Sequence, residues 1–180
     1  MSTRRPSSGR ARARPPTPAS AAAPAAAGLA PGAKVPDFTL PATGGGQVRL
    51  GELAGRKLVL YFYPRDNTPG CTLEGQQFAK LAPRFARAGV TVFGISRDSL
   101  ASHEKFRDKM GYPFALLSDA DERVCRLFDV IRKKNMYGRS VLGIERSTFL
   151  IDARGVLARE WRKVKVDGHA EEVLEAARAL

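Results

Sequence analysis

Cys71 stands where a thiol can react. It follows an apolar run at residues 57–63, a loop of turn-forming residues and a Pro-Gly pair, and it begins a segment with helical periodicity. Backbone N–H groups in the first turn of a helix have no partner within the helix and stabilise a thiolate. Cysteines at such positions commonly have pKa values lowered from about 8.5 into the range of about 3.5–7.5. We therefore expect Cys71 to be a reactive nucleophile rather than an inert buried thiol.

The residues around Cys71 narrow the type of reaction. Dithiol exchange requires a second cysteine three residues later, but that position is Glu74. A cysteine protease requires a histidine base, whereas His103 and His169 lie far along the chain in segments with helical patterns, where we expect them to face solvent. A further reaction open to such a thiolate is attack on a peroxide. That reaction needs polarisation of the peroxide, stabilisation of the leaving oxygen and limited access of water.

Three further residues have side chains suited to a peroxide reaction. Thr68 can turn its hydroxyl towards a substrate oxygen, and Pro64 can form a pocket wall without offering a competing hydrogen-bond donor. Arg146 precedes a predicted strand, and its guanidinium can hold a thiolate and stabilise charge that develops across the peroxide. The edge of a buried strand is a rigid place from which to do so.

The spacing Pro64-x-x-x-Thr68-x-x-Cys71 resembles the active-site pattern of the peroxiredoxins. The runs at residues 61–64 and 68–72 are similar to the bacterioferritin comigratory protein branch of that family, also called the Q type. Further strings that resemble this branch stand at residues 117–119, 136–138 and 143–152. The resemblance covers about residues 34–180. It implies a thioredoxin-like fold, thiol-dependent reduction of hydrogen peroxide and organic hydroperoxides, and antioxidant defence.

The resemblance also implies roles for individual residues. Cys71 matches the peroxidatic cysteine, and Thr68, Pro64 and Arg146 match the remaining active-site positions. Glu74 matches an acidic position that orients the arginine, although an acid in the first turn of a helix is also favoured by the helix dipole alone. No flavin, haem or metal motif is present, so we expect chemistry on sulfur alone, with no cofactor and no metal.

The sequence departs from the branch in its second cysteine. Many members carry a resolving cysteine five residues after the peroxidatic one, where this chain has Gln76. Others carry it in the next helix, but residues 100–110 contain none. Cys125 is the only other cysteine, and its apolar neighbours predict a packed helix face. We expect a one-cysteine cycle with a thioredoxin, glutaredoxin or small-thiol reductant; resolution by Cys125 would require part of a helix to unwind.

Hydrophobic patterning predicts the elements that position these residues. Strands are expected at residues 35–40, 47–50, 57–63, 90–96, 114–117, 147–152 and 156–164, with a glycine turn at 44–46. Helices are expected at residues 72–88 with a kink at Pro83, at 100–110 with Ser99 as cap, at 120–128 with Asp119 as cap, and at 169–180. This order predicts an α/β, thioredoxin-like fold whose mixed central sheet is flanked by helices.

Residues 1–33 form a separate region in which five arginines occur without any acid. We expect a disordered Arg/Ala/Pro-rich tail, because little apolar surface is available there to offset the entropy of ordering. An organelle transit peptide and an arm that contacts nucleic acid are two other interpretations of this segment. Without these arginines, 25 basic and 18 acidic residues remain, a net charge of +7 for the domain at residues 34–180.

The sequence also favours or excludes several partners. No run of about 20 apolar residues is present, so no membrane association is expected. We expect the protein to be cytoplasmic. We also expect a monomer, because the sequence shows no long exposed apolar stripe that could bind a second copy. A basic loop at residues 132–139 is either solvated or contacts an acidic reductant or nucleic acid, the last being the least favoured. The alternative function is that of a basic, redox-inactive or chaperone-like binding protein that uses its N-terminal tail.

Overall fold

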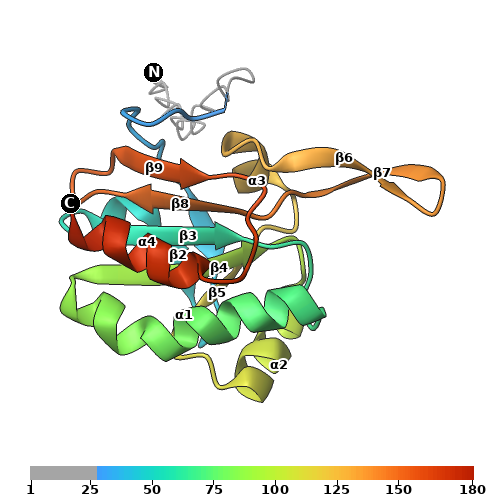
Figure 1. The fold of residues 1–180 in the computed structure, drawn as a ribbon, viewed down its shortest axis with the longest axis horizontal. Coiled ribbons are helices and arrows are strands. Elements are labelled where there is room, and N and C mark those ends of the chain that lie inside the picture. Colours follow the sequence, from blue (N-terminus) through green and yellow to red (C-terminus); the bar gives the residue numbers. More distant parts are fainter. Residues whose placement is uncertain (1–27) are drawn as a thin grey trace, which may run out of the picture.

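The computed structural model describes residues 28–180, and residues 1–27 of the expected tail lie outside the described part. Its centre is a five-stranded sheet in the order β5 (Leu116–Ser118), β4 (Val90–Ser96), β3 (Lys57–Phe62), β8 (Ser147–Ile151) and β9 (Leu157–Trp161). Strand β4 is parallel to β3 and β5, whereas β8 is antiparallel to both β3 and β9. The predicted mixed sheet and thioredoxin-like α/β fold are therefore confirmed, with helices α1 and α4 side by side on one face of the sheet (Figure 1).

Apart from β6 and β7, the strands and helices come in the predicted order along the chain. The strands are β1 (Thr39–Pro41), β2 (Gln47–Arg49), β3 (Lys57–Phe62), β4 (Val90–Ser96), β5 (Leu116–Ser118), β6 (Ile131–Met136), β7 (Arg139–Ile144), β8 (Ser147–Ile151) and β9 (Leu157–Trp161). The helices are α1 (Pro69–Arg87), α2 (Leu100–Met110), α3 (Arg123–Leu127) and α4 (His169–Arg178), with a 3-10 turn at Leu50–Leu53. Helix α1 continues through Pro83, and β4 and α2 have the predicted bounds.

Strand β3 explains why the molecule has two cores. Successive side chains of a strand point to opposite faces of its sheet. Leu60 and Phe62 belong to one buried cluster, which includes Cys125 of α3, whereas Val59 and Tyr61 belong to the other, which includes residues of α1, α2 and α4. Because β3 is buried on both faces, its sequence is a nearly continuous apolar run.

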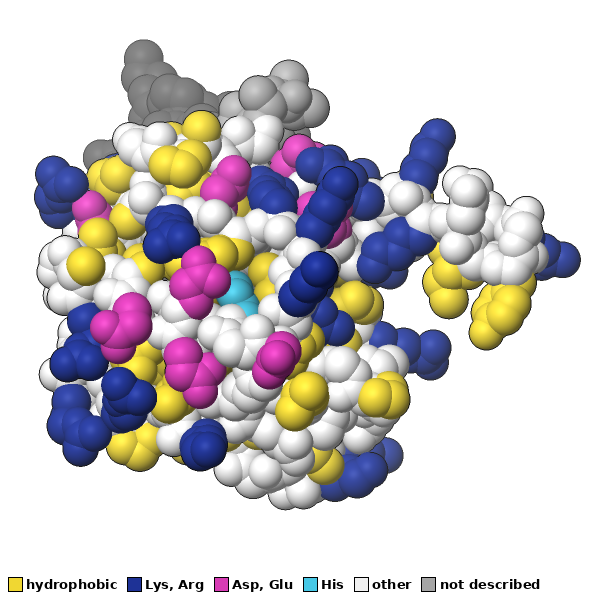
Figure 2. Space-filling model, in the orientation of Figure 1, with side chains coloured by type: hydrophobic (Ala, Val, Ile, Leu, Met, Phe, Trp, Pro, Cys, Tyr) yellow, Lys and Arg dark blue, Asp and Glu magenta, His cyan; other side chains and the backbone are white. Residues whose placement is uncertain are grey.

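The segment at residues 131–144 differs from the prediction of a basic loop. It forms a two-stranded antiparallel hairpin of β6 and β7, which projects from the body (Figure 1). Its tip is Tyr137-Gly138, and both residues have positive φ, at 52° and 75°. Apolar side chains are exposed along this arm together with basic ones (Figure 2). The arm has hardly any buried face, so the alternation that reveals a strand is missing from its sequence.

The structure differs from the prediction in two smaller ways, in the length of α3 and in the last residues of the expected tail. The predicted helix at 120–128 is shorter, although the Asp119 carboxylate still accepts N–H bonds from Val124 and Cys125 at 3.2 and 2.6 Å. Leu29 packs against one core, and the Gly32 N–H donates to the Leu157 carbonyl at 2.7 Å, so residues from 28 onward already contact the body. Within the described residues, no helix is long and apolar enough to cross a membrane.

Candidate active site

Cys71 lies in the first turn of α1, close to where β3 ends. Pro69 occupies the first helical position, where its missing N–H costs nothing, and Thr68 is the N-cap residue with extended backbone. The Thr68 carbonyl accepts the Thr72 N–H at 2.9 Å and so starts the helical hydrogen bonds. Only 2% of Cys71 is exposed. The thiol therefore lies at the N-terminal end of the helix and is almost completely shielded from solvent.

Arg146 reaches Cys71 from a different part of the chain. It lies in the short connection between β7 and β8, and its Nη2 donates to Cys71 Sγ at 3.3 Å. Its Nη1 donates to the carboxylate of Glu74, one helical turn after Cys71. A Cβ at Gly70 would lie 3.1 Å from Nη2, so glycine at that position gives the guanidinium room. The structure thus brings Cys71, Glu74 and Arg146 into direct contact.

Burial sets the charge state of Glu74. Removal from water raises its pKa to about 7, although the Arg146 guanidinium acts in the opposite direction. Burial also opposes the charge on Arg146, but Glu74 and Cys71 more than compensate and its pKa is raised. Oε1 of Glu74 has no hydrogen-bond partner among the described residues. One permanently charged guanidinium is therefore shared between a thiol and a carboxyl group that changes its charge near neutral pH.

Thr68 and Pro64 occupy the loop between β3 and α1. The Thr68 hydroxyl donates to the Arg65 carbonyl at 2.9 Å, which leaves its oxygen lone pairs free to accept. Both residues are half-buried. Among residues 28–180, neither is hydrogen-bonded to Cys71, whose one side-chain partner is Arg146. The structure therefore places Thr68 and Pro64 in the loop that leads to the thiol without joining them to it.

Two residues near the site were not singled out from the sequence. Lys134 of β6 donates to the Ile144 carbonyl at 2.5 Å, and its pKa is lowered by burial and by the charge of Arg146. Tyr112 donates to the Thr72 carbonyl at 3.1 Å and lies against Gly75. Lys134 stood within a run of basic residues, which was the available signal; Tyr112 offered none.

Cys125 is buried on the opposite face of the sheet. Its exposed fraction is 0%, and it packs in the cluster that contains Phe62, whereas Cys71 packs with Tyr61. Burial and the neighbouring Asp119 carboxylate raise the pKa of the Cys125 thiol far above its usual range. Both cysteines are free. The structure therefore does not bring Cys125 together with Cys71.

The expectation that both histidines face solvent is wrong. His103 is 0% exposed and His169 is 5% exposed. Nε2 of His169 lies 2.8 Å from the Thr148 hydroxyl, and burial lowers its pKa to about 4. A polar residue in a helical pattern is normally assigned to the solvent face, and the partners that permit burial come from distant segments.

Comparisons with known proteins agree on one group. A model of the AhpC/TSA family matches residues 31–160. Peroxiredoxin Bcp of Xanthomonas campestris is 55% identical over 143 residues, which cover 79% of this chain and 89% of the relative. Peroxiredoxin Bcp of Bacillus subtilis is 44% identical over 149 residues, which cover 83% and 95%. The solved structure of Xanthomonas campestris Peroxiredoxin Q has a TM-score of 0.76 at 55% identity and covers 79% of this chain and 90% of its own.

Proposed function

Because the chain belongs to the AhpC/TSA family and is a peroxiredoxin, a thiol peroxidase, we propose that Cys71 is the residue whose thiolate attacks the peroxide. The observation that carries this assignment is the Arg146 guanidinium, 3.3 Å from Cys71 Sγ at the start of α1. A guanidinium in a water-poor site stabilises both the thiolate and the charge that develops on the peroxide oxygens.

The proposed reaction uses only sulfur and peroxide. The Cys71 thiolate attacks one oxygen, an S–O bond forms as the O–O bond breaks, and the leaving oxygen takes up a proton and departs as water or an alcohol. Cys71 is oxidised by two electrons to a sulfenic acid. The Thr68 hydroxyl, with its lone pairs free, orients the peroxide, and Pro64 limits water without adding a donor.

Hydrogen peroxide and organic hydroperoxides are the proposed substrates. A Xanthomonas campestris bacterioferritin comigratory protein, 54% identical and covering 79% of this chain, has been described for its alkyl peroxide reduction activity. Removal of these peroxides corresponds to the role in antioxidant defence.

We propose a one-cysteine cycle for the return to the thiol. The sheet lies between the clusters that hold the two cysteines, and Cys125 has a raised pKa, so it supplies neither proximity nor a thiolate. An external thiolate then attacks the Cys71 sulfenic acid, hydroxide leaves as water, and a second thiol frees Cys71 from the mixed disulfide. Thioredoxin, glutaredoxin or a small thiol supplies these electrons.

Intact-mass analysis after one equivalent of hydrogen peroxide, without reductant, tests the cycle. The expected product gains one oxygen and keeps one free thiol, and a Cys125→Ser variant gives the same gain. A Cys71→Ser variant is the matched control and should consume no peroxide. Loss of both thiols without dimer formation would instead establish a disulfide between Cys71 and Cys125. No change in mass would contradict the assignment of Cys71.

A cytoplasmic location and a monomeric state belong to the same proposal. Both cysteines are free, which suits a reducing compartment. The monomer is tested by sedimentation, since the exposed apolar side chains of the β6–β7 arm provide a surface that the sequence did not reveal: Met136, Tyr137, Val141 and Leu142. The alternative of a redox-inactive binding protein is disfavoured by the contact between Cys71 and Arg146.

A further inference from the structure

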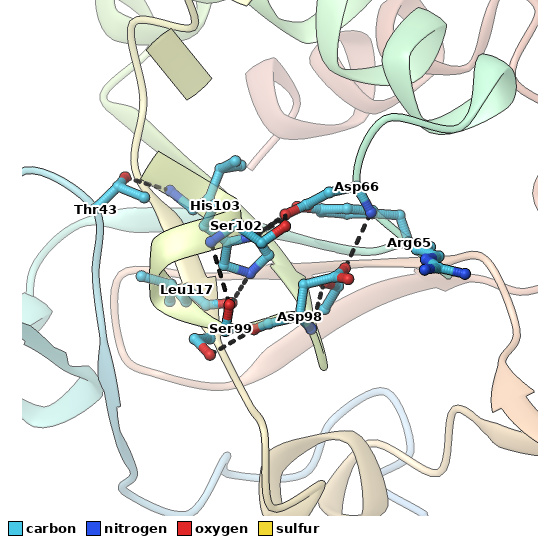
Figure 3. Close-up of polar contacts among 12 residues, drawn as sticks. Thr43, Arg65, Asp66, Asp98, Ser99, Ser102, His103 and Leu117 are labelled. Carbon is cyan, nitrogen blue, oxygen red and sulfur yellow. Dashed lines mark hydrogen bonds and ion pairs between the residues drawn. The ribbon is translucent and has the colours of Figure 1, made fainter. Parts of the chain in front are cut away.

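We propose that His103 is a positioning residue for the peroxide reaction, acting through a buried ion pair with Asp66. The inference rests on the proposed function of Cys71. Asp66 lies in the loop at residues 64–68, which carries Pro64 and Thr68 and leads into α1. His103 comes from the first turns of α2, and the two side chains meet inside the protein (Figure 3).

His103 joins the loop to the central sheet. Its Nδ1 lies 2.8 Å from Oδ2 and 3.0 Å from Oδ1 of Asp66, and its Nε2 lies 3.0 Å from the Leu117 carbonyl of β5. The His103 side chain is 0% exposed and that of Asp66 is 3% exposed. A single ring therefore links the loop before Cys71 to a sheet strand.

With Asp66 ionised, the proposed ion pair places a proton on each ring nitrogen of His103. A carbonyl oxygen only accepts, so Nε2 donates to Leu117. An ionised carboxylate also only accepts, so Nδ1 donates to Asp66. The Tyr63 hydroxyl lies 3.3 Å from Nδ1 but donates to Asp66 Oδ1 at the shorter distance of 2.7 Å. With both nitrogens donating, His103 is an imidazolium.

Asp66 is equipped to be its counter-ion. Burial opposes ionisation of Asp66, but hydrogen bonds from His103 and Tyr63 hold its pKa below the usual range. The Ser102 hydroxyl adds a bond to Oδ2 at 2.7 Å. The Asp98 carboxylate also faces this group and accepts the Asp66 N–H at 3.0 Å. The imidazolium therefore stands beside two carboxylates, and the bond from its Nδ1 fixes the side chain of Asp66.

The proposed ion pair and a metal ion at these side chains exclude each other. Asp66, Asp98 and His103 place potential ligand atoms within 4.8 Å of one another. A histidine ligand must offer a ring lone pair to the metal, and the proposed imidazolium has none. In this proposal, hydrogen bonds hold the cluster together, and the cluster holds the loop at residues 64–68 in place.

The loop geometry shows what the ion pair positions. Asn67, the next residue, has a φ of 58°. This left-handed backbone conformation is uncommon for residues other than glycine. Thr68 follows, with its hydroxyl bonded back to the Arg65 carbonyl. Because Asp66 comes directly before this tight turn, holding Asp66 in place also holds the orientation of the Thr68 hydroxyl and the start of α1.

Two substitutions separate the two bonds of His103. Asparagine places an amide N–H near the position of Nδ1 and keeps a donor to Asp66, whereas glutamine places it near Nε2 and keeps a donor to Leu117. We expect His103→Gln to lower the second-order rate constant of Cys71 oxidation by hydrogen peroxide about 10- to 100-fold, as expected for a misplaced group near the reaction. His103→Asn should retain most of the wild-type rate.

Denaturant unfolding of both variants shows whether stability accounts for the difference. Similar unfolding midpoints with unequal peroxide rates support a positioning role. Equal losses of rate in both variants, no loss in either, or a loss confined to His103→Asn would overturn it.

A measurement on the wild-type protein covers the case in which neither variant folds. Nitrogen-15 NMR at neutral pH should show that both ring nitrogens of His103 carry protons, and a ring with one protonated nitrogen would contradict the ion pair. Peroxide consumption by the wild type is measured in parallel. If it were absent, the proposed function would fail while the NMR result still decided the state of His103.

Discussion

Replacing Arg146 by glutamine should separate activity from stability. The substitution removes the donor 3.3 Å from Cys71 Sγ and leaves the Glu74 carboxyl group, which is 1% exposed, without its cation. Removal of one partner from a buried ion pair commonly costs about 3–5 kcal/mol, because the other charge stays buried. Glu74 has an alternative, since its pKa of about 7 means that the neutral form is already half populated near neutral pH.

This pKa limits the cost of the Arg146→Gln variant. At neutral pH, Glu74 can become fully protonated for less than about 1 kcal/mol, so the charge contribution to the stability loss is small. Each pH unit above the pKa adds about 1.4 kcal/mol to the cost of keeping the proton. Two units higher, the variant should be about 2–3 kcal/mol less stable relative to wild type than it is at neutral pH.

The peroxide rate should behave differently. Loss of a donor that stabilises developing charge costs about 100- to 1000-fold in rate. Stopped-flow measurement of Cys71 oxidation gives the rate, and denaturant unfolding at the two pH values gives stability. The double variant with Glu74→Gln is the control: its extra instability at high pH should disappear while its rate stays low. A loss of about 3–5 kcal/mol already at neutral pH would refute a Glu74 that titrates there.

Three further outcomes follow from buried groups. The raised pKa of Glu74 makes stability fall as pH rises from 4.5 to about 7, whereas the lowered pKa of His169 makes it fall as pH drops from 6.5 to about 4. The two effects oppose each other. In the Glu74→Gln variant only the His169 effect remains, so its free energy of unfolding should fall by up to about 3 kcal/mol as the pH drops from 6.5 to about 4. Urea titrations measure this free energy, and no change across that pH range would disprove the prediction. Cys125→Ala should lose about 1 kcal/mol in unfolding experiments yet keep full turnover with an external thiol; lost turnover would restore Cys125 to the cycle. Gly75→Ala places a Cβ 2.3 Å from the Tyr112 hydroxyl, so thermal unfolding should reveal about 1–3 kcal/mol of destabilisation, and a neutral result would mean that Tyr112 moves freely.

Local sequence signals predicted the elements whose stability is mainly local. Helix α2 has the predicted bounds, and the Ser99 hydroxyl caps it by accepting the Ser102 N–H at 3.2 Å. The continuous apolar run at residues 57–63 likewise predicted the strand that forms β3. The position of Arg146 before a predicted strand made it a candidate partner of the Cys71 thiolate, and the family resemblance pointed to the same residue, although the contact spans 75 positions.

Other features depend on contacts that a single segment does not encode. The β6–β7 arm is held by backbone pairing with little buried face, so its basic sequence resembled a loop. His103 is buried because Asp66 and Leu117, 37 and 14 positions away, offer acceptors for both ring nitrogens. Helical periodicity registers only that histidine is polar.

The central sheet also bears on how long the enzyme survives its own reaction. Under the proposed one-cysteine cycle, Cys125, which lies in the cluster on the other face, forms no protective disulfide with an oxidised Cys71. The lifetime of its sulfenic acid is then set by the supply of outside thiol. When peroxide is abundant and thiol scarce, a second peroxide converts Cys71 to a sulfinic acid, which ordinary thiols do not reverse. Under this cycle, the sheet that separates the two cysteines limits the amount of peroxide to which the protein can be exposed before it loses its peroxidase activity.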